Sequence, residues 1–70
     1  MMAVRGWDVV VVGDQWVLDF DGRREVIGLA ELPWGIAVDA ACEFMDRIDS
    51  TRMPSAELMA LCVKNAWRQC

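Results

Sequence analysis

The sequence contains no histidine and no tyrosine, and its side-chain hydroxyls are limited to Ser50, Thr51 and Ser55. One chain therefore cannot build a Ser-His or Cys-His nucleophile pair, because the imidazole that activates the nucleophile is missing. The glycine-rich phosphate-binding motifs of nucleotide-binding proteins are absent as well. We therefore predict that the protein is not an enzyme and that it uses no cofactor.

Cysteine is present in an odd number, as Cys42, Cys62 and Cys70, with no C-x-x-C motif. This spacing fits neither a disulfide framework nor a zinc site. We expect reduced thiols that pack in the core, and no metal. A thiol-dependent or metal-dependent activity requires an exposed cysteine, with the terminal Cys70 as the candidate for a reactive thiol.

Positive charge is also scarce, because 7 Lys and Arg residues stand against 11 Asp and Glu residues, for a net charge of −4. A domain that follows a phosphate backbone normally has a basic face, so nucleic acid is a disfavoured partner. The alternative hypothesis of a small nucleic-acid-associated regulator depends on Arg5, Arg23 and Arg24 around Trp7. It predicts binding that weakens steeply with salt.

Long apolar runs are missing, and the longest one covers only residues 58–63. A membrane-spanning helix needs about 20 apolar residues, and the first eight residues do not form the apolar core of a signal peptide. We therefore expect no membrane contact and a cytoplasmic location.

What the chain does have is a high apolar content, 56 % over 70 residues, which predicts one folded domain spanning residues 1–70. A core of this size rarely supplies more than about 3–5 kcal/mol of stability. Chains this short therefore often need a partner, and the expected one is a second copy in a homodimer.

The first half of the chain has the pattern of a β-meander. A β-branched run at residues 9–12 ends at Gly13-Asp14, period-two alternation follows over residues 16–21, and Asp21-Gly22 is a strong two-residue turn signal. A third strand is expected at residues 23–29. Two-residue turns would oppose Val12 with Gln15 and Phe20 with Arg23.

This register predicts a different role for each face of the sheet. The predicted core face holds Trp7, Val9, Val11, Trp16, Leu18, Phe20 and Ile27. The other face gathers Val10, Val12, Val17 and Val26 beside Asp8, Asp19 and Arg24, and Asp19 and Arg24 form a cross-strand pair of opposite charge. A valine surface with a charged rim is a candidate interface.

Two amphipathic helices are expected in the second half, at residues 33–49 and from Pro54 onward. The predicted buried positions of the first are Trp34, Ala37, Val38, Ala41, Phe44, Met45 and Ile48. Those of the second are Ala56, Met59, Cys62, Val63, Ala66, Trp67 and Cys70. The short connector between them favours an antiparallel pair. The predicted fold is therefore α+β, with a three-stranded antiparallel β-meander followed by two antiparallel helices packed on one face.

Four further residues have no firm place in a single-chain core. Leu58 and Leu61 fall outside the predicted buried stripe of the second helix, Trp7 is close to the start of the chain, and Trp34 is at a helix entrance. An exposed leucine is ordinary on a monomer, while tryptophan is enriched at interfaces. We treat all four as interface candidates beside the four valines.

Five residue types with GC-rich codons, Ala, Val, Asp, Arg and Gly, supply half of the chain, and arginine outnumbers lysine six to one. In this composition the chain resembles the small orphan proteins of actinobacteria and of their bacteriophages. The resemblance implies a phage accessory protein that binds a host or phage protein. Together with the missing catalytic groups, it leads us to expect a non-enzymatic protein–protein interaction module.

Overall fold

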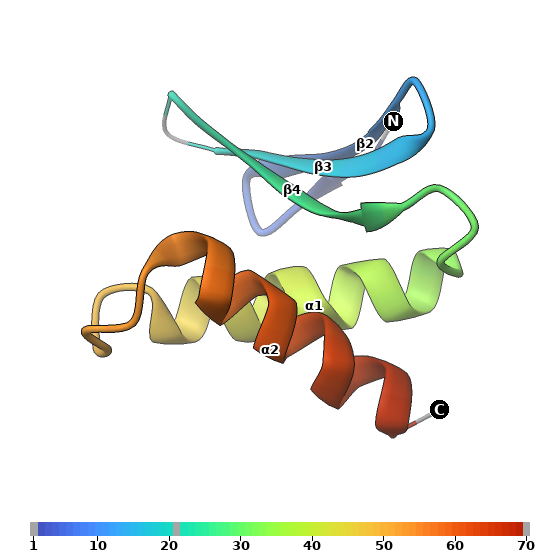
Figure 1. Cartoon of the computed structure of the whole chain (residues 1–70). Coiled ribbons are helices and arrows are strands. Elements are labelled where there is room, and N and C mark those ends of the chain that lie inside the picture. The colour runs from blue at the N-terminus through green and yellow to red at the C-terminus, as the bar shows by residue number, and fades with distance from the viewer. Residues whose placement is uncertain (1, 21, 70) are drawn as a thin grey trace.

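The computed structural model describes residues 2–20 and 22–69, with a four-stranded antiparallel sheet followed by two helices. The strands β1 (Met2–Val4), β2 (Trp7–Val12), β3 (Gln15–Phe20) and β4 (Arg23–Leu29) lie side by side in chain order. The helices α1 (Trp34–Arg47) and α2 (Ser55–Arg68) cover one face of the sheet (Figure 1). The predicted α+β fold, a meander followed by two helices, is confirmed.

Next to both hairpin turns, the register of the sheet is the one that the turn signals predicted. Val12 opposes Gln15 and Phe20 opposes Arg23, so both hairpins close as expected. The positive φ of Gly22, +74°, fits the predicted turn. Three predictions fall outside the described residues. They are Asp21 in the second turn, the reactive thiol of Cys70 and the core position of the Phe20 side chain.

Strand β1 is an addition to the predicted three strands. It pairs with β2 through a turn at Arg5 and Gly6, which have φ values of 55° and 86°. Arginine rarely adopts a positive φ, so Arg5-Gly6 is not a recognisable hairpin signal in the sequence. An ion pair of 3.1 Å from Arg5 Nη1 to Asp46 Oδ1 connects this turn to α1.

The core lies between the sheet and the helices. Its largest fully buried side chains come from the sheet, from α1 and from α2. They are Phe44, Leu18, Leu58, Met59, Val9 and Cys62. Alanines at 37, 40 and 41 line the buried side of α1 and let the helix approach its neighbours closely. Leu32, in the β4–α1 loop, completes the cluster.

Both helices are turned about their axes relative to the predicted stripes. In α1, Ile36 and Ala40 are buried, while Val38, Met45 and Ile48 are half-buried and Trp34 is exposed. In α2 the buried residues are Leu58, Met59, Cys62 and Ala66, whereas Ala56 and Trp67 are exposed. On the sheet, Val11 is also exposed instead of buried. These corrections move apolar side chains from the expected core to the surface.

A β-bulge in β4 has a direct effect on the surface. Val17 opposes Val26, but the next residue of β3, Trp16, opposes Gly28, so Ile27 is the extra residue. The shift places Leu29 opposite Gln15 on the outer face, where regular pairing would have directed it toward the helices. Leu29 is consequently 54 % exposed.

Candidate functional site

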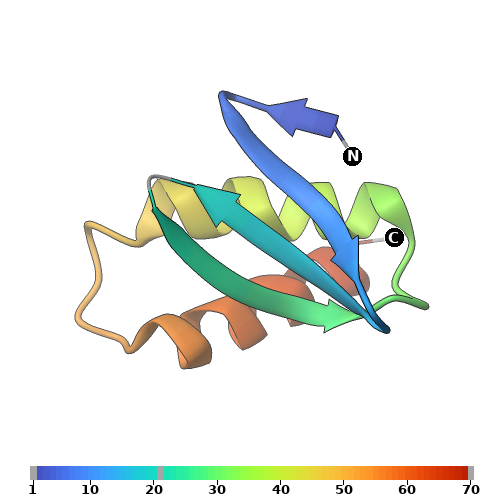
Figure 2. The ribbon, with the colours of Figure 1, turned by 90° about the horizontal axis from the view of Figure 1, so that it is seen from above.

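Exposed apolar side chains gather at one end of the molecule. The β2–β3 turn, the end of β4 and the start of α1 lie at this end, and the last turn of α2 points to the same end from the opposite side of the molecule (Figure 1 and Figure 2). These segments carry five of the large hydrophobic residues that are exposed in the described part of the chain: Val11, Val12, Leu29, Trp34 and Trp67. Exposed apolar groups that lie together indicate a contact surface more strongly than scattered ones do.

The outer face of the sheet carries the predicted valine face, which consists of Val10, Val12, Val17 and Val26. Pairing places Val17 between Val10 and Val26, and Val12 continues the row toward the turn. Val12 and Val26 are about half exposed. The prediction that these four valines share one face of the sheet is therefore confirmed.

Val17 differs from the other members because it is only 4 % exposed, although it does not belong to the core cluster under the helices. It lies in an inner strand, and its neighbours on β2 and β4 cover it. Val17 is thus the buried centre of the valine face, and the side chains that a partner can reach are those of Val12 and Val26.

A row of charges crosses the same face. Arg24 Nη2 lies 3.2 Å from Asp19 Oδ2, which confirms the predicted cross-strand pair. Asp8 opposes Asp19 from the other side and makes no ion pair with another described residue. The row therefore contains two carboxylates and one guanidinium, and the rim of the valine face is slightly acidic.

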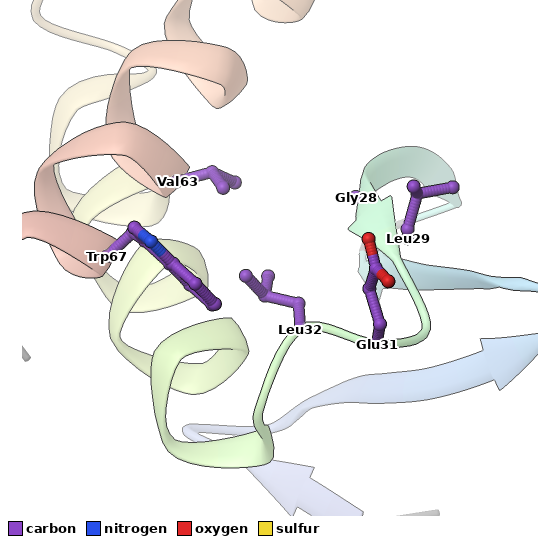
Figure 3. Close-up of a pocket in the computed structure, with 6 residues that line it drawn as sticks. All are labelled: Gly28, Leu29, Glu31, Leu32, Val63 and Trp67. Carbon is purple, nitrogen blue, oxygen red and sulfur yellow. The ribbon is translucent and has the colours of Figure 1, made fainter.

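An apolar groove of about 520 Å³ adjoins the valine face where β4 and α2 diverge (Figure 3). Its lining residues come from the end of β4, the following loop and the last turns of α2: Gly28, Leu29, Glu31, Leu32, Val63 and Trp67. Figure 3 shows Leu32 between the two walls and the Glu31 carboxylate on the strand side. The groove has the size of a site for a large apolar side chain or a small ligand.

Two tryptophans hold the loop that forms this groove. Trp16 Nε1 donates a hydrogen bond of 2.6 Å to the Leu32 carbonyl oxygen. The Trp16 ring also packs against Trp34, with ring centroids 5.4 Å apart and an angle of 49° between the planes. The predicted interface residue Trp34 is therefore exposed beside the groove, with one side of its ring held in place.

Outside the valine face, two of the predicted interface residues are not available to a partner. Trp7 is 5 % exposed and Leu58 is 2 % exposed, and both belong to the core. Leu61 is half-buried. Leu58 is buried because α2 is rotated about its axis relative to the predicted stripe, so that Leu58 belongs to the core cluster.

The groove residues Leu29, Leu32, Glu31 and Val63 were not predicted as part of a site. The only hint in the sequence is Gly28, because a glycine inside a strand often marks a bulge. The groove arises from that bulge together with the divergence of β4 and α2, and neither has a local sequence pattern.

The basic cluster of the nucleic-acid hypothesis is neutralised in the structure. Arg5 pairs with Asp46, Arg23 with Glu25, and Arg24 with Asp19, at 3.1–3.3 Å. Trp7, the proposed stacking platform, is buried. These residues do not form a free basic surface with an exposed aromatic ring, which is what base stacking on a phosphate-binding face requires.

The two described cysteines are free thiols in different surroundings. Cys42 is half-buried, while Cys62 is fully buried between the helices and the sheet. Burial raises the pKa of the Cys62 thiol from 9.0 to about 11, and the nearby Glu43 carboxylate adds to the increase. Cys62 is therefore a neutral, packed thiol at physiological pH.

Raising the pH should destabilise the fold between about pH 9 and pH 11. In this window the Cys62 thiol ionises in the unfolded chain while it stays protonated in the folded one. The unfolded state thus binds fewer protons, and the free energy of unfolding falls as the pH rises. Urea denaturation over this range measures the fall in a protein with Cys42→Ser and Cys70→Ser. Adding Cys62→Ala should flatten the curve, and an unchanged slope would contradict the assignment.

No protein-family model, curated protein or solved structure matches this chain. In the described residues, neither helix is long and apolar enough to cross a membrane.

Proposed function

We propose that the protein is a non-enzymatic protein-binding module whose partner docks on the valine face. The observation that carries this proposal is the uncovered outer face of the sheet. The helices cover only the opposite face (Figure 1), and Val12, Val26 and Leu29 remain about half exposed in a chain with a small core. Burying these side chains would stabilise a complex by removing apolar area from water.

The partner that fits this face has an apolar centre and at least one basic side chain at its edge. Among the described residues, Arg24 is the one counter-ion that pairs with Asp8 or Asp19, so a cation from the partner would complete the row. The net charge of −4 favours the same class of partner. We further propose that this happens in the cytoplasm, with a host or phage protein as the partner, in line with the composition.

Capture from a lysate of the source organism or of its host tests the proposal, with immobilised wild-type protein compared with Val26→Asp. Val26 is on an edge strand and 51 % exposed, so its substitution should leave the fold intact. We expect a protein that is retained by wild type and lost with Val26→Asp, and the purified pair should bind at least about tenfold more weakly when Val26 is replaced.

Arg52→Asp is the matched control, because Arg52 is exposed in the α1–α2 connector and away from the valine face. It adds the same aspartate elsewhere on the surface and should retain the partner. Equal capture by wild type and Val26→Asp would overturn the proposal.

A further inference from the structure

One flank of α2 has the features of a helix–helix interface but faces solvent. Ala56, Ala60, Val63 and Trp67 recur at spacings of four, three and four residues, and we refer to them as the α2 stripe. Ala56, Ala60 and Trp67 are exposed and Val63 is half-buried. Spacings of four and three place the four side chains in a single row, as at the core positions of a coiled coil.

The position of α2 leaves this flank free. The helix packs on α1 through the opposite side, where Asn65 Nδ2 donates a hydrogen bond to Glu43 Oε1. Its first turn is connected to the start of β4 by a 2.9 Å hydrogen bond from Arg23 Nη2 to Ser55 Oγ. Figure 1 shows the second half of α2 running away from the sheet and from α1, toward the lower edge of the molecule. The α2 stripe also continues into the apolar groove, since Val63 and Trp67 line both.

We propose that the α2 stripe binds a second copy of this chain through an antiparallel α2–α2 pair related by a two-fold axis. This proposal rests on the proposed function only in treating the protein as an interaction module, and it uses a different surface from the valine face. A two-fold contact requires a surface that is complementary to itself, and the α2 stripe meets this requirement in both size and charge.

Size complementarity follows from the order of the residues. In an antiparallel pair, Trp67 of one helix lies opposite Ala56 of its partner, and Val63 lies opposite Ala60. Each large side chain therefore meets a small one, at both ends of the contact. A parallel pair would stack Trp67 on Trp67 and Ala56 on Ala56, with too much volume at one end and a gap at the other.

Charge complementarity follows from the residues next to the stripe. Glu57 and Lys64 are exposed, lie one heptad apart on the same side of the stripe, and make no ion pair with another described residue. The antiparallel arrangement brings Glu57 of each copy opposite Lys64 of the other, so the pair forms twice. Charges in these flanking positions select the orientation and the partner of helix pairs.

Charge reversal tests the helix pair by sedimentation velocity over a micromolar concentration series. We expect the wild type to form a dimer and Lys64→Glu or Glu57→Lys to raise its dissociation constant at least about tenfold, because each change acts twice. The double variant Glu57→Lys with Lys64→Glu should restore the dimer. Circular dichroism checks that every variant keeps its helices, as expected for exposed positions.

Two controls separate this proposal from the proposed function. Asp14→Lys reverses an exposed charge in the β2–β3 turn, on the sheet and not on α2, and should leave the dimer intact. Val26→Asp should also leave it intact while removing the partner of the valine face. A wild-type monomer at every concentration overturns the helix pair. A dimer that dissociates with Val26→Asp but tolerates both charge reversals also overturns it and assigns self-association to the valine face.

Discussion

Replacing Phe44 with alanine is expected to leave most of the chain unfolded at 25 °C. Phe44 is the largest of the fully buried side chains, on the side of α1 that faces the sheet and α2. Truncating a buried phenylalanine costs about 3–5 kcal/mol, because apolar contacts are lost and a cavity remains. The whole core of such a short chain supplies roughly the same amount. Urea denaturation followed by far-ultraviolet circular dichroism measures the loss.

Met45→Ala is the matched control, since Met45 is the next residue of α1 and only half-buried. Its side chain packs against the edge of the core, so its truncation removes less buried area and should leave a folded protein with a lower denaturation midpoint. A Phe44→Ala protein with the midpoint of the wild type would contradict the placement of Phe44 at the centre of the core.

The parts of the fold that the sequence predicted are those specified by local chemistry. Gly13 and Gly22 adopt positive φ in two-residue turns, and these turns determine the register of β2, β3 and β4 up to the bulge at Ile27. Strand β1 escaped prediction because its turn uses Arg5, a residue with no preference for that backbone conformation. The strand pairs with the adjacent β2, and its turn forms an ion pair with Asp46, which is distant in sequence.

The helices show a second limit of sequence patterns. Apolar residues occupy more than half of the circumference of each helix, so periodicity predicts that a buried face exists but not where its centre lies. In the packed structure Leu58 is buried in the core, whereas Trp67 is exposed at the surface. The most exposed apolar part of α2 is thus a consequence of tertiary packing.

The candidate site divides in the same way. The valine face was predictable because strand alternation alone brings Val10, Val17 and Val26 together. The apolar groove was not, because it depends on the bulge at Ile27 and on the angle between β4 and α2. A one-residue bulge reversed the direction of Leu29 and thereby connected the two surfaces at the end of β4.

Val17→Asp is expected to unfold the protein, whereas Val26→Asp is expected to leave it folded. Both valines lie on the same face and oppose each other across β3 and β4, but Val17 is 4 % exposed and Val26 is 51 % exposed. A carboxylate at position 17 would lose most of its hydration between neighbouring valines, and a buried unpaired charge costs several kcal/mol. This cost is comparable to the whole stability of a domain of this size.

At position 26 the carboxylate reaches water at the edge of the sheet, and the cost falls to about 1 kcal/mol, the difference in strand preference between valine and aspartate. Denaturation at neutral pH should therefore separate the two variants widely. Val17→Asn extends the test, because the amide has a similar volume without charge and should destabilise the fold less than aspartate does. If Val17→Asp and Val26→Asp were equally stable, the valine at position 17 would have to be accessible. The valine face would then be accessible at its centre as well as at Val12 and Val26.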